Sequence, residues 1–111
     1  MAIKIFIDQG HNPQNPNAGA EGNGLREQDI TYDTGLRLAS LLRDNGNFEV
    51  RLSRNTPTEQ LGTSNASSLA ERVRAANDWG ADYFISLHTN ASTDPSASGT
   101  EAYAFSSNSR G

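Results

Sequence analysis

The sequence predicts an α/β fold: a mostly parallel twisted sheet with helices on both of its faces. This prediction depends on the order of the segments and on the length of the chain. Strand-like apolar runs alternate with stretches of helical periodicity, in the order strand, helix, strand, helix, strand, strand. A helix between two consecutive strands returns the chain to the same edge of the sheet, so the first three strands are expected to be parallel, with right-handed crossovers. A chain of 111 residues has room for one hydrophobic core and therefore for one domain.

Four segments have the composition of strands. Ile3 to Asp8 is a nearly continuous apolar run, as expected for a strand covered on both faces. Phe48 to Ser53 alternates apolar and polar residues, which predicts a more exposed strand. Asp82 to Leu87 is rich in aromatic and branched residues. Gly99 to Phe105 alternates again and follows a connection too short for a covering helix, so we expect an antiparallel strand or an edge strand.

Two segments have the three- and four-residue spacing of amphipathic helices. The first runs from Glu27 to Asn45 and has Gly46 as its stop. The second is expected to begin at a cap on Ser67 or Ser68 and to end at Gly80. The inward stripes predicted for the two helices are Ile30, Thr34, Leu38, Leu41 and Leu42 in the first and Leu69, Val73 and Ala76 in the second.

Composition excludes several classes of function. The net charge is −4, the pI is about 5.0, and the Lys and Arg residues are scattered, so nothing favours a nucleic-acid-binding protein. No apolar stretch approaches membrane-spanning length, and no basic-then-apolar signal segment begins the chain. The sequence contains no cysteine, so any metal site must use His, Asp or Glu.

The two histidines of the chain fall at corresponding places. His11 follows the first predicted strand, and His88 ends the third. Glu27 starts the first helix, which begins at the same carboxyl edge of the sheet, where open α/β sheets bind ligands. Two imidazoles, one carboxylate and an open fourth position make a hydrolytic zinc site. The pattern alone leaves ordinary interpretations open, because strand-end histidines are often surface residues and a first-turn Glu favours the helix dipole.

Five phrases of the chain, in order across Ile3 to Phe105, resemble those of a known family. They are IDQGH (7–11), GLRE (24–27), RNT (54–56), ERVRAAN (71–77) and FISLHTNA (84–91). The chain is similar to the zinc-dependent N-acetylmuramoyl-L-alanine amidases of the type with a His/Glu/His site, which occur as bacterial autolysins and phage endolysins.

The resemblance implies that His11, Glu27 and His88 are the ligands of Zn²⁺. It implies a hydrolase that cleaves the amide between N-acetylmuramic acid and the L-alanine of the stem peptide, with peptidoglycan as partner and the cell wall, extracellular or periplasmic, as the place of action. In that chemistry zinc polarises the lactyl carbonyl, water attacks it, and a carboxylate carries the proton to the leaving amine.

The resemblance covers only the first part of the family's domain. It implies that residues 1–111 are a single, truncated amidase catalytic domain that lacks the C-terminal part. The glutamate that serves as general base is expected beyond Gly111, so no catalytic residue is assigned within the chain. The alternatives are a non-catalytic fragment that binds zinc or muropeptide, and a plain α/β domain without a site. An uncovered sheet edge would also let the chain self-associate.

Two further residues are candidates for an outer role at the site. Asp8 ends the first strand and either hydrogen-bonds a ligand imidazole or caps a turn. Asn90 lies two residues after His88 and either orders the loop or touches substrate. Arg72 is expected on a solvated helix face or in an ion pair.

Overall fold

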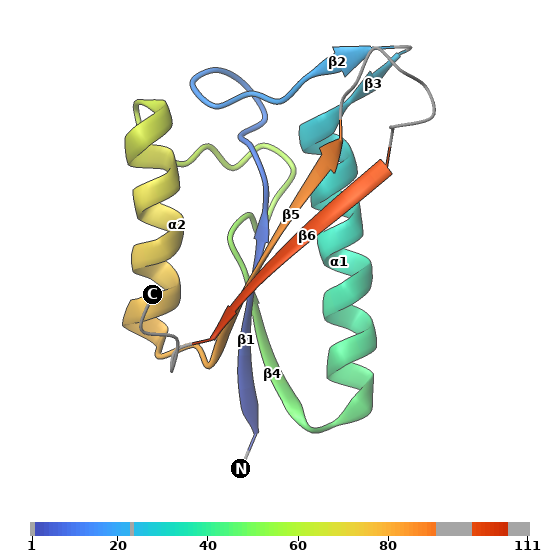
Figure 1. The fold of residues 1–111 in the computed structure, drawn as a ribbon, viewed down its shortest axis with the longest axis vertical. Helices are drawn as coiled ribbons and strands as arrows, with labels where there is room; N and C mark the ends of the chain where they lie inside the picture. Colours follow the sequence, from blue (N-terminus) through green and yellow to red (C-terminus); the bar gives the residue numbers. More distant parts are fainter. Residues whose placement is uncertain (1, 23, 91–98, 107–111) are drawn as a thin grey trace.

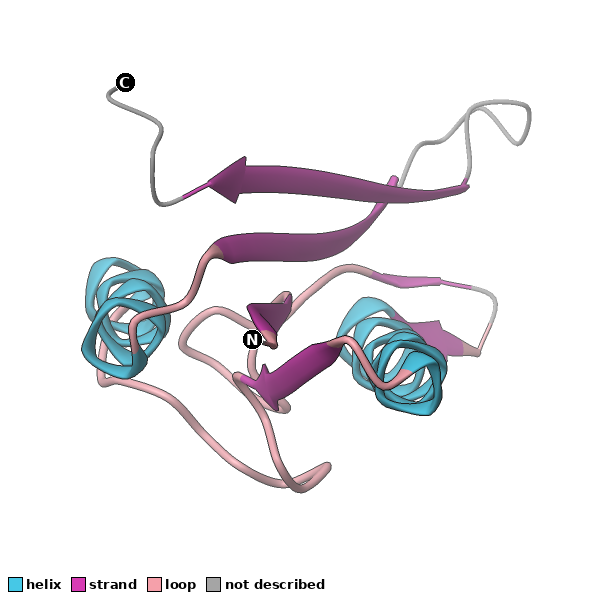
Figure 2. Ribbon diagram, turned by 90° about the horizontal axis from the view of Figure 1, so that it is seen from below, coloured by secondary structure: helices cyan, strands magenta, loops and turns pink. Residues whose placement is uncertain are grey.

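A four-stranded sheet in the order β4-β1-β5-β6 forms the centre of the molecule, and a two-stranded ribbon, β2-β3, lies beside it. The computed structural model describes residues 2–22, 24–90 and 99–106. The elements are β1 (Ile3–Gln9), β2 (Glu21–Gly22), β3 (Leu25–Arg26), α1 (Glu27–Asn45), β4 (Phe48–Leu52), α2 (Asn65–Trp79), β5 (Tyr83–Asn90) and β6 (Gly99–Ser106). Helices α1 and α2 lie on opposite faces of the sheet (Figures 1 and 2).

The pairing of the strands confirms the predicted fold class. Strand β1 is parallel to both of its neighbours, β4 and β5. Strand β6 is antiparallel to β5 along its full length and is an edge strand within the described part of the chain. Neither described helix is long and apolar enough to cross a membrane.

The hydrophobic core lies between α1 and the parallel strands. Its buried members are Ile5, Ile7, Ala39, Val50, Leu52 and Leu87. Helix α1 has the predicted bounds, but its predicted inward stripe is partly wrong, since Leu41 is 70% exposed. Small residues set the contact face instead: a Cβ on Gly35 would come within 2.4 Å of Cγ of Gln9. The backbone of α1 therefore approaches the sheet more closely than a leucine stripe would allow.

Helix α2 begins earlier than predicted. Its N-cap is Ser64, whose side chain accepts a hydrogen bond from the backbone N–H of Ser67, while Ser67 bonds back to Ser64. This reciprocal pair is a capping box, which satisfies two N–H groups at the helix start. Ser67 therefore occupies the third helical position, and the prediction that Ser67 or Ser68 is the cap was wrong.

The buried face of α2 also differs from the prediction. Leu69 and Val73 are about half exposed, whereas Ser68, Arg72 and Ala76 are buried. These three residues recur every four positions, so they share one face of the helix. The charged Arg72 lies on this face because its guanidinium donates to Asp8 and Gln9 of strand β1.

Strand β5 continues three residues beyond its predicted end, so His88 lies within the strand and not at its tip. The reason is the pairing with β6, which extends the ladder through Asn90 and Gly99. The side chains of His88 and Ser86 consequently point to the same face of the sheet, because side chains alternate along a strand.

Candidate metal centre

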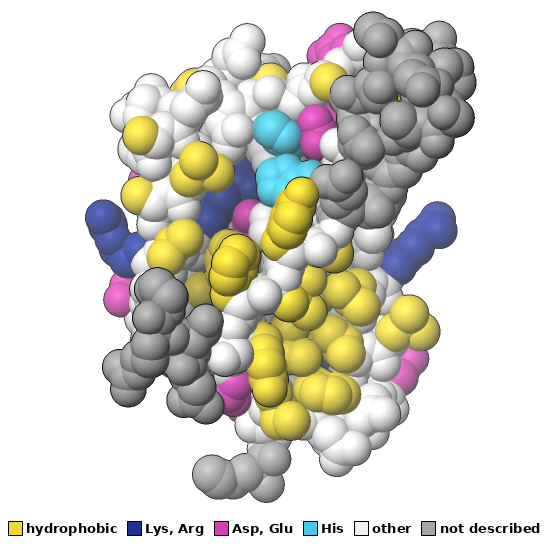
Figure 3. Space-filling model, in the orientation of Figure 1, with side chains coloured by type: hydrophobic (Ala, Val, Ile, Leu, Met, Phe, Trp, Pro, Cys, Tyr) yellow, Lys and Arg dark blue, Asp and Glu magenta, His cyan; other side chains and the backbone are white. Residues whose placement is uncertain are grey.

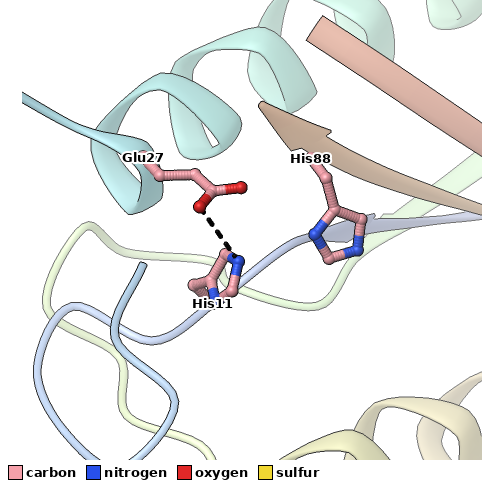
Figure 4. A group of neighbouring side chains, drawn as sticks. All are labelled: His11, Glu27 and His88. Carbon is pink, nitrogen blue, oxygen red and sulfur yellow. Dashed lines mark ion pairs between the residues drawn. The ribbon is translucent and has the colours of Figure 1, made fainter. Parts of the chain in front are cut away.

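Three side chains from separate parts of the chain converge at the carboxyl edge of the parallel strands (Figure 4). His11 follows β1, Glu27 is the first residue of α1, and His88 lies on β5. Each offers a ligand atom, and these atoms lie within 4.8 Å of one another. The Nε2 atom of His11 is 3.2 Å from Oε1 of Glu27, and the two imidazole rings are nearly perpendicular at 5.4 Å. The structure thus brings together all three residues that the sequence singled out.

Glu27 is buried and its carboxylate is held by backbone groups on both sides. Oε2 accepts the N–H of Thr89 at 2.9 Å, and Oε1 accepts the N–H of Ala20 at 3.3 Å. Gly19 lies against this side chain, where a Cβ would come within 2.7 Å of Cβ of Glu27. The loop before β2 and the end of β5 therefore fix the direction of the carboxylate.

His11 occupies a left-handed backbone conformation, with φ of 71°. Its Nδ1 lies 3.1 Å from Oδ1 of Asn17, and the amide of Asn17 in turn donates to the hydroxyl of Ser68 on α2. An amide oxygen only accepts, so a neutral His11 carries its proton on Nδ1. The lone pair of Nε2 then faces an oxygen of Glu27, and two electron-rich atoms at this distance need a proton or a cation between them.

His88 is half-buried and is oriented through its other ring nitrogen. Its Nε2 lies 2.9 Å from the hydroxyl of Ser86, which leaves Nδ1 as the nitrogen available to the site. Figure 4 shows one ring nitrogen of His88 turned toward Glu27 and His11. Gly10 packs beside the ring, and Tyr103 on β6 contacts its other side at a centroid distance of 6.3 Å.

Arg72 joins α2 to the loop that carries His11. It is 1% exposed and forms an ion pair with Asp8 at 2.8 Å. It also donates to the carbonyl oxygens of Gln9 and His11 and to Oδ1 of Asn12. Of the two predicted environments, the ion pair is correct and the solvated face is wrong. The small residues four positions before and after Arg72 were the sequence signal for a buried arginine.

A second buried arginine, Arg54, holds the first turn of α1. It donates to the carbonyl oxygen of Gln28 at 2.7 Å and lies over the ring of Tyr32. Burial, and then the nearby charge of Arg72, lower the pKa of Arg54 from its ordinary value. Sequence reasoning gave Arg54 no role beyond its place in the phrase RNT, because its burial depends on partners distant along the chain.

The two residues predicted to play outer roles have different outcomes. Asp8 is buried and does not contact an imidazole directly; its Oδ2 accepts the hydroxyl of Ser86, which contacts His88. Asn90 pairs with Gly99 in the ladder, but its side chain lies outside the described part of the structure.

An α/β sheet with two imidazoles and a carboxylate at its carboxyl edge offers a group of side chains that could hold a metal ion. The sequence profile of the N-acetylmuramoyl-L-alanine amidase family matches residues 5–110, and the chain belongs to this family.

Known relatives agree with this membership. The amidase CwlM of Bacillus licheniformis is 44% identical over 90 residues, which cover 80% of this chain and 32% of that protein. The sporulation-specific amidase of Bacillus subtilis is 37% identical over 103 residues, which cover 93% and 36%. The solved catalytic domain of the amidase CwlV from Bacillus (Paenibacillus) polymyxa var. colistinus superposes with a TM-score of 0.68 at 30% identity, covering 83% of this chain and 48% of that one.

The chain therefore spans about a third of the length of these two relatives and about half of the solved domain.

Proposed function

We propose that the chain carries the zinc-binding part of a peptidoglycan hydrolase that cleaves the amide between N-acetylmuramic acid and the L-alanine of the stem peptide. The observation that carries the proposal is the convergence of His11, Glu27 and His88. Family membership supports the class of substrate. The site of action is then the cell wall, on the extracellular or periplasmic side.

The donor set fits zinc. Four ligands in a tetrahedron about 2.0–2.1 Å from an ion lie about 3.3 Å from one another. The separation of 3.2 Å between Nε2 of His11 and Oε1 of Glu27 is close to that value. Imidazole and carboxylate are ordinary zinc ligands, and three protein ligands leave a fourth position for a reacting group.

The roles of the three side chains follow from their surroundings. Glu27 is buried and supplies the negative charge, whereas the two histidines are only half-buried and face the surface (Figure 3). The substrate carbonyl can therefore approach from the side of the imidazoles. Zinc, when bound, supplies a Lewis acid that polarises this carbonyl and allows water to act as a nucleophile near neutral pH.

A second candidate function, a module that binds zinc or muropeptide without turnover, is favoured by one observation. Among the side chains that the structure describes, the two carboxylates near the histidines are already engaged: Glu27 by two backbone N–H groups and His11, and Asp8 by Arg72 and Ser86. Neither is placed to carry a proton to a leaving amine, so we assign no general base among the described residues.

The test compares Glu27→Gln with Glu49→Gln, which changes an exposed acid on β4. Removing the charge of Glu27 should weaken zinc binding by more than the roughly 10–100-fold typical of an outer hydrogen-bond partner. The control should bind zinc like the wild type. Zinc content after dialysis and the affinity from a competition titration give the result, and equal binding by both variants would contradict the proposed site.

Release of stem peptides from purified cell wall separates the two candidate functions. Zinc-dependent release that is lost in Glu27→Gln and kept in Glu49→Gln supports the hydrolase. Zinc and wall binding without release supports the binding module. A wild-type chain that binds neither zinc nor cell wall contradicts both.

A further inference from the structure

A buried chain of hydrogen bonds leads from Arg72 to His88. The guanidinium of Arg72 donates to Oδ1 of Asp8 at 2.8 Å. The hydroxyl of Ser86 donates to Oδ2 of the same carboxylate at 2.9 Å, and its oxygen lies 2.9 Å from Nε2 of His88. Arg72, Asp8 and Ser86 are all buried, so water does not replace these partners readily.

The number of available protons decides the direction of each bond. The carboxylate of Asp8, paired with Arg72, only accepts. A serine hydroxyl has one proton, and Ser86 uses it to donate a hydrogen bond to Asp8. The oxygen of Ser86 must then accept from His88, so the proton of the imidazole is on Nε2 and the lone pair is on Nδ1.

We propose that Asp8 and Ser86 are positioning residues that fix the Nε2–H tautomer of His88, so that Nδ1 faces Glu27 and His11. The role in metal binding rests on the proposed function; the tautomer does not. With a metal bound, His11 would have the opposite arrangement, because Asn17 accepts from Nδ1 and Nε2 faces Glu27. Outer hydrogen bonds of this kind set which nitrogen of a histidine is available to a metal.

The first experiment reads the tautomers in metal-free protein. The chain has only two histidines, so long-range ¹H–¹⁵N spectra of the 111-residue chain, assigned with His11→Ala, resolve both rings. We expect the proton on Nε2 of His88, because the oxygen of Ser86 accepts from that nitrogen. A wild-type His88 with its proton on Nδ1 would overturn the proposal.

The variant Asp8→Asn should exchange the donor and acceptor in the hydrogen bonds from position 8 through Ser86 to His88. Its amide oxygen should face Arg72, so its NH₂ group should donate to Ser86. The hydroxyl of Ser86 is then released to donate to His88, whose proton should move to Nδ1. An unchanged tautomer in a folded Asp8→Asn variant would contradict the inference.

The variant Ser86→Ala provides a second test that keeps the ion pair between Asp8 and Arg72. We expect zinc affinity to fall by about 10–100-fold, as is typical when an outer partner of a ligand is lost. The matched control is Ser53→Ala, which removes another buried serine hydroxyl, one that accepts the N–H of Gln9. Its zinc affinity should stay at the wild-type value.

The outcomes separate this inference from the proposed function. If Ser86→Ala binds zinc as tightly as the wild type, the positioning role is wrong even though the zinc site stands. If the wild-type chain shows the predicted tautomer of His88 but binds no zinc, the proposed function fails and the role of Asp8 and Ser86 in fixing that tautomer stands. If Asp8→Asn fails to fold, the wild-type spectrum and the zinc affinity of Ser86→Ala still decide the proposal.

Discussion

Gly10 lies between β1 and His11, at a point where the main chain touches the neighbouring strand. Its N–H donates to the carbonyl oxygen of Leu87 at 3.0 Å. A Cβ at this position would come within 2.5 Å of that oxygen and within 2.8 Å of Nδ1 of His88. The absence of a side chain at Gly10 therefore keeps His88 in place.

We predict that Gly10→Ala destabilises the fold by about 1–3 kcal/mol, the usual cost of overpacking, and weakens zinc binding because His88 must shift. Urea denaturation and a zinc titration measure the two effects. The control is Gly22→Ala, where a Cβ meets nothing within 4 Å. Its stability should change by less than about 0.5 kcal/mol. Equal behaviour of the two variants would show that the close contact at Gly10 is unimportant.

Individual residues differ in how far the sequence could predict them. The convergence of His11, Glu27 and His88 was predictable because strand ends and a helix start share one edge of a parallel sheet. Arg72 was not, because the partner that buries it, Asp8, is 64 positions away along the chain. Ser86 had a weaker signal: it is two residues before His88 and must share its face of the strand.

At the scale of elements, the start of α2 depends on the reciprocal bonds of Ser64 and Ser67. We predict that Ser64→Ala destabilises the protein by about 1 kcal/mol, because the backbone N–H of Ser67 loses its acceptor. Thermal unfolding followed by circular dichroism measures the change. Ser40→Ala is the control, since Ser40 is an exposed residue within α1 and alanine favours a helix interior. A loss in Ser40→Ala as large as in Ser64→Ala would argue against the cap.

Helix α1 was predicted with its observed bounds, whereas the face of α2 was not. In α1 a glycine stop and long apolar periodicity agree with the packing, and Leu38 and Leu42 do pack against the core. In α2 the apolar residues Leu69 and Val73 point to the exposed side, because the inward side is used for the buried arginine. Apolar spacing predicts the buried face of a helix only when the buried residues are the apolar ones. A buried ion pair places a charged residue on that face, so the prediction fails.

At the scale of the whole molecule, the two edges of the sheet, as far as the structure describes it, have opposite character. Strand β4 alternates exposed charged residues, Glu49 and Arg51, with buried apolar ones, which protects an edge from pairing. Strand β6 exposes Tyr103 and Phe105, and Phe105 lines an apolar groove toward Val73 of α2. Figure 3 shows extensive apolar surface on the face where β6 lies. The edge at β6 thus has the features of a surface that pairs with a second copy.

We predict that the 111-residue chain self-associates through β6, and that Phe105→Lys shifts it toward the monomer because a charge on an edge strand opposes pairing. Sedimentation velocity over a range of protein concentrations measures the association. Leu41→Lys is the matched control: Leu41 is the more exposed residue, at 70% against 58% for Phe105, but it lies on α1. It should associate like the wild type, since it does not touch β6. A wild-type chain that is monomeric and melts sharply at every concentration would contradict the prediction, and equal loss of association in both variants would place the contact elsewhere than at β6.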